Sequence, residues 1–164
     1  MRLRELREKD APLMLEWMHD STVVNDLKAD FGSKTINDCV TFIGKSLNDC
    51  ENVHKAIVDD QDVYMGTVSI KNIDVDKESG EFAITVRKSA MGKGYAQYAI
   101  KEIIRIGFQE LNLNYIYWCV SRKNLRAIKF YDKMGYKEIK MISREILQRY
   151  QGEDDLKWYG VEKI

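Results

Sequence analysis

Hydrophobic and polar residues alternate along this chain with two different periods. Over residues 95–111, apolar side chains recur at spacings of three and four and share one face, which predicts a long amphipathic helix. A second helix is predicted over 124–134, ending at Gly135, where glycine can adopt the left-handed conformation that stops a helix. Residues 35–50 predict another helix, and a fourth is expected to begin after Asp10, with the only proline in its first turn.

Between these helices lie short runs typical of β-strands. The predicted strands cover residues 2–6, 55–59, 63–70, 81–86 and 115–120, with one or two more from residue 140 onward. Turns rich in Asp and Gly separate the central strands, at 59–62 and 76–80. The order of elements indicates a mixed α/β domain with a strand-loop-helix unit in its middle.

Composition narrows the classes of protein to consider. The 164 residues are 45% apolar, enough for one core, and no linker or repeat divides them, so residues 1–164 are expected to form a single domain. Lys plus Arg and Asp plus Glu both number 26, which leaves no basic excess for general nucleic-acid binding. Neither a membrane span nor a signal peptide is apparent, so a cytoplasmic protein is expected.

Candidate metal and disulfide chemistry is sparse. Three cysteines and two histidines show no spacing typical of a zinc site or a disulfide framework, so no metal is expected. Cys119 could in principle carry an acyl group, but it lies in an aromatic strand without an activating neighbour in sequence, and packing explains it better.

The segment from 81 to 97 carries the most informative pattern. A strand leads into a loop with Gly92 and Gly94, and the long helix follows immediately. Glycines allow positive φ and close approach of a ligand, and the free N–H groups of a helix N-terminus attract phosphate. The loop lacks the Gly-Lys-Ser/Thr of a P-loop, so an ATP or GTP site of that type is remote. A tight turn between strand and helix would explain the glycines equally well.

A second segment, residues 120–136, favours a ligand site over a simple turn as the explanation of the glycines. It contains Asn124, then Ala127, then Phe130-Tyr131, then Gly135-Tyr136. Together the two segments resemble the GNAT superfamily of N-acetyltransferases, and weaker likenesses at 10–20, 64–68 and 152–155 resemble its branch of ribosomal-protein N-terminal and polyamine acetyltransferases. The resemblance implies a single-domain GNAT-like fold, with a mixed twisted sheet flanked by helices. It also implies acetyl-CoA as co-substrate.

The resemblance assigns residues to the acetyl-CoA site. The strand backbone would hold the acetyl group and the pantetheine arm, the loop would hold the pyrophosphate, and the start of the second helix would contact the arm. These residues are Ile84, Thr85, Val86, Met91, Gly92, Lys93, Gly94, Tyr95, Ala96, Gln97, Asn124, Ala127 and Tyr131. Asn124 could also serve as an N-cap. Met91 departs from the superfamily pattern, which places Gln or Arg there.

The resemblance further implies direct attack of a neutral amine on the thioester, with positioning supplying much of the rate. Tyr131 is expected to be the general acid, although the helical pattern alone would make it a core residue. Glu81 is the candidate base, since polyamine-acetylating relatives carry a glutamate at that place. His19 is a second candidate for the base. Trp17, His19 and Asp20, with the region 21–35, are expected to shape the acceptor pocket.

The predicted function is therefore acetyl transfer to a primary amine, which could be an amino sugar, a polyamine or a peptide N-terminus. The alternative is an acyl-CoA-binding sensor on the same fold, in which Tyr131 and Glu81 have no catalytic task. Nucleic acids and membranes are not expected partners. The sheet edges and the aromatic C-terminal strand would allow a homodimer.

Overall fold

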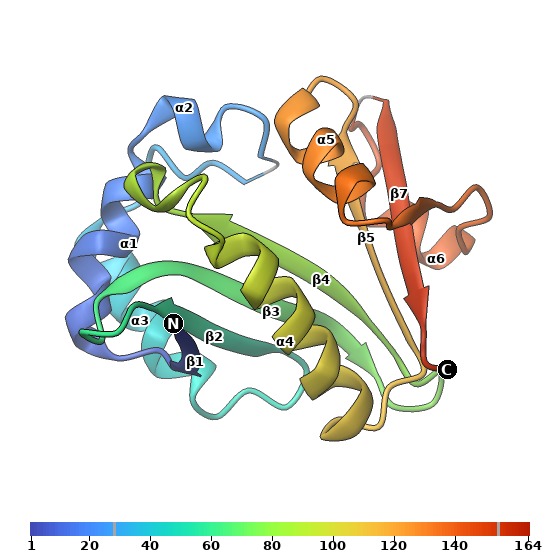
Figure 1. Cartoon of the computed structure of the whole chain (residues 1–164), viewed down its shortest axis with the longest axis horizontal. Helices are drawn as coiled ribbons and strands as arrows, with labels where there is room; N and C mark the ends of the chain where they lie inside the picture. Colours follow the sequence, from blue (N-terminus) through green and yellow to red (C-terminus); the bar gives the residue numbers. More distant parts are fainter. Residues whose placement is uncertain (28, 154) are drawn as a thin grey trace.

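The predicted mixed sheet is confirmed. A computed structural model describes residues 1–27, 29–153 and 155–164, and these form one seven-stranded sheet in the order β1-β2-β3-β4-β5-β7-β6 (Figure 1). The strands are β1 (Arg2–Glu5), β2 (Val53–Val58), β3 (Tyr64–Asp74), β4 (Ser79–Val86), β5 (Tyr115–Ser121), β6 (Lys137–Glu138) and β7 (Leu156–Glu162). Neighbouring strands are antiparallel except β4 and β5, which run parallel.

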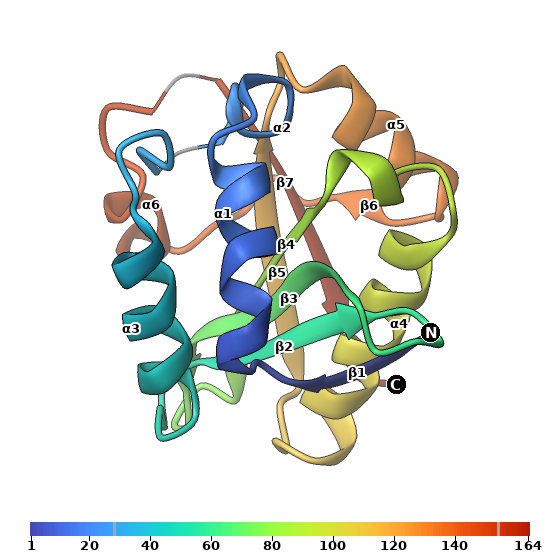
Figure 2. The same cartoon turned by 90° about the vertical axis from the view of Figure 1, so that its left-hand side faces the viewer.

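Helices cover both faces of this sheet. They are α1 (Ala11–Met18), α2 (Ser21–Val24), α3 (Ile36–Ser46), α4 (Tyr95–Gln109), α5 (Leu125–Lys133) and α6 (Arg144–Gln148), with 3-10 turns η1 (Glu8–Asp10) and η2 (Lys88–Ala90). Figure 2 shows α1 and α3 in front of β1 to β3, with α4 behind them. No helix within the described ranges is long and apolar enough to cross a bilayer.

Two hydrophobic clusters follow from this layering. Along β2, Ile57 packs into the cluster under α4 and α5, while Ala56 and Val58 pack into the cluster formed with α1 and α3. Strand side chains point alternately to the two faces, so a strand covered on both sides contributes to both cores. The central strands are therefore buried on both faces, and they are rigid supports for groups at their ends.

Three predicted boundaries need correction. Asp10 does not cap α1 with its side chain; its carboxylate accepts hydrogen bonds from Arg7 N at 2.8 Å and from the Arg4 guanidinium, and η1 precedes the helix. The helix expected to reach residue 50 ends at Ser46. The C-terminal part contains α6, which the strand prediction from residue 140 missed, and β6 begins earlier than expected.

Candidate active site

The two parallel strands separate part of the way along their length. β4 and β5 are paired only from Ser79 with Tyr115 to Glu81 with Tyr117. Beyond this point the described part of β5 gives no partner to residues 82–86, and the two strands diverge visibly in Figure 1. The opening between them exposes strand backbone that an inserted ligand could hydrogen-bond.

The hydrogen-bond phase of β4 determines which backbone groups face this opening. Arg87 N donates to Met65 O at 2.8 Å, and backbone groups along an antiparallel strand alternate between its two neighbours. By that alternation, Ile84 and Val86 direct their N–H and C=O groups to the opening, whereas Thr85 directs its own to β3. Ile84 and Val86 are thus the backbone positions available to a ligand.

The glycine loop lies between β4 and α4, after η2. Gly92 has φ of 74° and Gly94, at the N-cap of α4, has φ of 88°, both in the left-handed region that glycine adopts without strain. A methyl group built on either glycine would meet no atom within 4 Å, so the space beside the backbone is open. Met91, Tyr95 and Ala96 pack against the core, while Lys93 and Gln97 are exposed.

Within the described residues, no side chain caps the start of α4. The helix is 15 residues long, and its first N–H groups have no partner inside the helix, so its positive end lies free beside the open glycine loop. A helix end of this kind is able to hold a phosphate, and the pyrophosphate site predicted from the sequence stays a prediction.

An aromatic cluster closes the narrow end of the opening. Phe82 and Trp118 follow the last paired residues of β4 and β5, and their ring centroids lie 5.2 Å apart. Tyr131 packs edge-on or tilted against both rings and against Tyr159, and only 5% of its surface is exposed. Burial raises the pKa of Tyr131, which therefore stays protonated at neutral pH.

The hydroxyl of Tyr131 has no hydrogen-bond partner among the described residues, and neither has the buried Nε1 of Trp118. Buried polar groups normally have a partner, because an unmet hydrogen bond costs about 1–3 kcal/mol. The Nε1 of Trp118 is such a group, whereas the Tyr131 hydroxyl is not among the fully buried unpaired atoms.

The start of α5 is built as the sequence suggested. Asn124 is its N-cap, and Asn124 Oδ1 accepts a hydrogen bond from Ala127 N at 3.1 Å. Gly135, just after the helix, has φ of 86° and makes the expected left-handed stop. These local contacts fix the helix register that directs Tyr131 into the aromatic cluster.

Glu81 lies on the other face of the sheet, since its neighbour Phe82 faces the α4 side. Its carboxylate is 3% exposed and accepts a hydrogen bond from Tyr150 Oη at 2.7 Å. Lys71 Nζ lies 3.6 Å and Arg149 Nη1 3.7 Å from its oxygens. Glu81 Oε2 has no hydrogen-bond partner within the described chain. Glu81 is thus a buried carboxylate with two cationic side chains nearby, at the last paired position before the opening.

The sequence did not point to Lys71, Arg149 or Tyr150 as neighbours of Glu81. Lys71 is opposite Glu81 in the β3–β4 ladder, so a predicted register would have found it. Arg149 and Tyr150 follow α6 and lie more than sixty residues away in sequence, and no local pattern relates them to β4.

The expected acceptor residues have mainly structural contacts. Trp17 is 4% exposed and donates from Nε1 to Tyr64 Oη at 2.9 Å. His19 is exposed, with Nε2 2.7 Å from Lys34 O, and Asp20 caps α2 by accepting from Thr22 N at 2.9 Å. Position 28 of the region 21–35 and position 154 of the segment 152–155 lie outside the described residues.

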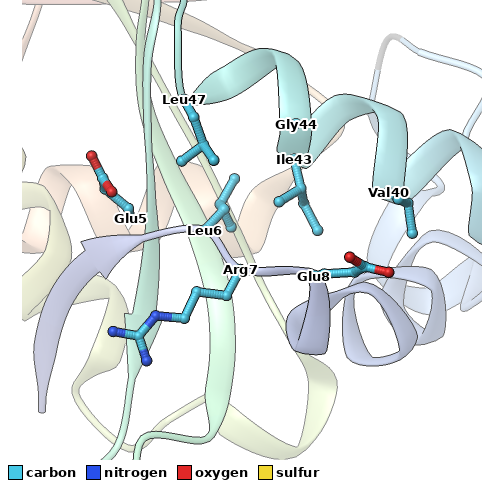
Figure 3. Close-up of a pocket in the computed structure, with 8 residues that line it drawn as sticks. All are labelled: Glu5, Leu6, Arg7, Glu8, Val40, Ile43, Gly44 and Leu47. Atoms are coloured by element: carbon cyan, nitrogen blue, oxygen red, sulfur yellow. The ribbon is translucent and has the colours of Figure 1, made fainter.

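A separate hollow lies away from this opening. Figure 3 shows it between α3 and the segment that links β1 to η1, with a volume of about 490 Å³. Its lining is apolar with charged rims: Glu5, Leu6, Arg7, Glu8, Val40, Ile43, Gly44 and Leu47. It shares no residue with the opening between β4 and β5. Among the residues that the structure describes, no group of three or more His, Cys, Asp or Glu side chains could hold a metal ion.

Known proteins resemble this chain in sequence and in fold. A spermidine N(1)-acetyltransferase of Vibrio cholerae is 30% identical over 94 residues, which are 57% of this chain and 54% of that protein. An N-acetyltransferase of Bacillus licheniformis, named p20, is 26% identical over 139 residues, 83% of this chain and 78% of that protein.

Among solved structures, the spermidine N-acetyltransferase of Vibrio cholerae in complex with CoA and spermine superposes with a TM-score of 0.81. The superposition covers 98% of this chain and 94% of that chain at 20% identity, so it supports the fold. The model of the acetyltransferase (GNAT) domain family matches residues 1–137, far more than half of the 164. The chain therefore belongs to the GNAT acetyltransferase family and is an N-acetyltransferase.

Proposed function

We propose that this protein transfers the acetyl group of acetyl-CoA to a primary amine, with polyamines as the preferred acceptors. The observation that carries the proposal is the opening between β4 and β5, with an uncapped helix N-terminus and an open glycine loop at its wide end. A pantetheine arm needs extended backbone to pair with, and a pyrophosphate needs free N–H groups.

The residues present fit acetyl-CoA. Gly92 and Gly94 leave room for the pyrophosphate next to N–H groups of the loop and of the first turn of α4. Ile84 and Val86 would hydrogen-bond the arm and the acetyl carbonyl through their backbone, and a fixed N–H there would stabilise a developing oxyanion. When bound, acetyl-CoA supplies the acetyl group as an activated thioester.

Two side chains on opposite faces of the sheet would handle the protons. The Tyr131 hydroxyl holds the proton that a leaving thiolate needs, and burial among aromatic rings keeps it on the oxygen. We propose that Glu81 accepts the proton of the attacking amine, directly or through water, at Oε2. Lys71 and Arg149 lie beside the other contacts of this carboxylate and hold it in place at the start of the opening.

The acceptor class rests on the relatives. Three of them are named spermidine N(1)-acetyltransferase, and one solved structure is a complex with CoA and spermine. The face of Glu81 is the acceptor side in this proposal, with Trp17, His19 and Asp20 as its outer wall. One related structure is a dodecamer, which supports our proposal that this chain also assembles with copies of itself. Light scattering of the purified protein would test that assembly.

The test of function is a thiol-release assay with acetyl-CoA and three acceptor classes: spermidine, glucosamine and a peptide with a free N-terminus. Mass spectrometry of the products would show where the acetyl group is attached. We expect spermidine to give the highest kcat/KM. A higher value for the sugar or the peptide would refute the polyamine assignment and leave the acetyltransferase intact. Binding of acetyl-CoA without turnover on any amine would indicate a sensor instead.

A further inference from the structure

The first position of the glycine loop is Met91, whose side chain has neither a charge nor an N–H donor for a phosphate. The structure shows what lies beside it. Arg126 Nη1, from the first turn of α5, is 3.0 Å from Met91 Sδ, although the two residues are 35 positions apart. A guanidinium therefore lies at the entry to the glycine loop, supplied by a different helix.

Arg126 is exposed and forms no ion pair with any described carboxylate, unlike its neighbours. Arg122 pairs with Glu138 and Asp155, and Arg87 pairs with Glu16. A thioether sulfur is a weak acceptor, so the contact with Met91 leaves most of the five donors of the guanidinium unused. An arginine without an ion pair in the described residues, held against Met91 at the start of the glycine loop, has the charge and the fork geometry that phosphate oxygens need.

We propose that Arg126 binds the pyrophosphate of CoA and replaces the cationic or amide side chain that the loop lacks at Met91. This inference rests on the proposed function, because it requires CoA at the glycine loop. In the complex, phosphate oxygens take the guanidinium donors in place of the sulfur. The side chain acts in binding only and takes no part in proton transfer.

The proposal is tested by calorimetric titration with CoA. Arg126→Gln removes the charge and keeps a polar side chain of similar length, and we expect the dissociation constant to rise about 10-fold or more, the size of a lost charge-assisted hydrogen bond. The matched control is Lys129→Gln, which removes one exposed charge from the same helix. We expect it to change the constant by less than about 2-fold. An equal effect of both variants would show only a general loss of positive charge, which would overturn the proposal.

Ligands with fewer phosphates locate the contact. The Arg126→Gln effect should be the same with dephospho-CoA, which keeps the pyrophosphate, and should vanish with pantetheine, which has no phosphate. An effect that vanishes already with dephospho-CoA would place Arg126 at the 3′-phosphate and contradict the proposal.

A rescue experiment separates binding from folding. Met91→Arg in the Arg126→Gln background should restore most of the affinity, since it places a guanidinium on the loop itself instead of on α5. Failure of this variant to restore binding, with unchanged thermal unfolding, would count against the proposal. If the unaltered protein does not bind CoA at all, the proposed function fails; if it binds CoA and Arg126→Gln binds equally well, only this inference fails.

Discussion

At the scale of single residues, Tyr131 is the position for which the sequence offered two interpretations, a core side chain and a general acid. It is a core residue, packed among Phe82, Trp118 and Tyr159, and it is also a phenol without a hydrogen-bond partner in the described chain. A purely structural tyrosine at this site could be a phenylalanine, since its hydroxyl makes no bond. The unused hydroxyl at the opening supports the catalytic role.

Replacing Tyr131 with Phe tests this role. We expect kcat to fall by about 10²–10⁴-fold, the usual contribution of a general acid, while the dissociation constant of acetyl-CoA changes little. The melting temperature should change little, because the hydroxyl makes no hydrogen bond within the described residues. Tyr136→Phe, in a half-buried ring 5.1 Å from Trp118, is the matched control and should retain activity. Full activity of Tyr131→Phe would exclude the residue as the acid.

Glu81 needs a different test, because it contacts two cations and a hydroxyl. Glu81→Gln keeps the shape and removes the charge, and we expect kcat/KM to fall about 100-fold or more. Tyr150→Phe keeps the carboxylate and removes the hydrogen bond that Glu81 accepts from Tyr150, so it should retain most of kcat/KM. An unchanged kcat/KM in Glu81→Gln would show that another group is the base. Thermal unfolding is needed beside it, because Lys71 and Arg149 lose their charged partner.

At the scale of elements, the loop and α4 form one unit in which glycine geometry and the helix end cooperate. Gly94 serves as N-cap and leaves the first N–H groups of α4 uncovered, whereas a Ser or Asp there would satisfy one of them. Gly94 therefore has no capping side chain at the position where a bound anion would accept hydrogen bonds from these N–H groups.

Gly94→Ala separates backbone strain from ligand binding. Its φ of 88° imposes about 1–2 kcal/mol on a residue with a Cβ, and the added methyl enters the open space beside the loop. We expect lower stability together with weaker CoA binding. Gly135→Ala has φ of 86° and the same open surroundings, but it lies after α5, so it should lose similar stability and keep its CoA affinity. Equal losses of affinity in the two variants would indicate that strain, and not the loop, is responsible.

At the scale of the whole molecule, one ionic network joins segments that are distant in sequence. Asp62, in the turn between β2 and β3, accepts hydrogen bonds from Arg2, Arg4 and Lys9 at 2.5–2.7 Å, and Arg4 also binds Asp10. Only 8% of the Arg4 side chain is exposed. The network fastens the edge strand β1 and the start of α1 to the central sheet.

This network predicts how stability depends on pH. Its cations hold the pKa of Asp62 well below the ordinary value of about 3.9. A carboxyl with a lowered pKa in the folded state stabilises the fold above the unfolded value, and this stabilisation is lost as pH falls toward the folded value.

Asp62→Asn should therefore unfold at lower urea than the unaltered protein at pH 7, and the difference should shrink below about pH 4. Asn is suitable because position 62 has φ of 64°, which Asn tolerates. Asp60→Asn, in the same turn but 85% exposed and paired with the N-terminus, should have a smaller effect. A difference that stays constant from pH 7 to pH 3 would rule out this electrostatic explanation.

The sequence by itself determined those parts of the protein that depend on a few consecutive residues. Its periodicities located β1 to β5 and the helices α4 and α5, because backbone conformation and side-chain alternation are local properties. The glycines at 92, 94 and 135 and the cap at Asn124 were equally readable, since positive φ and N-capping involve neighbours within three residues. The family resemblance came from the same two segments.

Only the tertiary structure decided which distant groups meet. The opening between β4 and β5 depends on where pairing ends, and the contacts of Glu81 with Arg149 and Tyr150 depend on how α6 returns to the sheet. Asp10 looked like a helix cap, yet it binds Arg4, because a buried arginine needs a carboxylate more than the helix needs that cap. These outcomes follow from register and packing across the whole chain, which no local pattern contains.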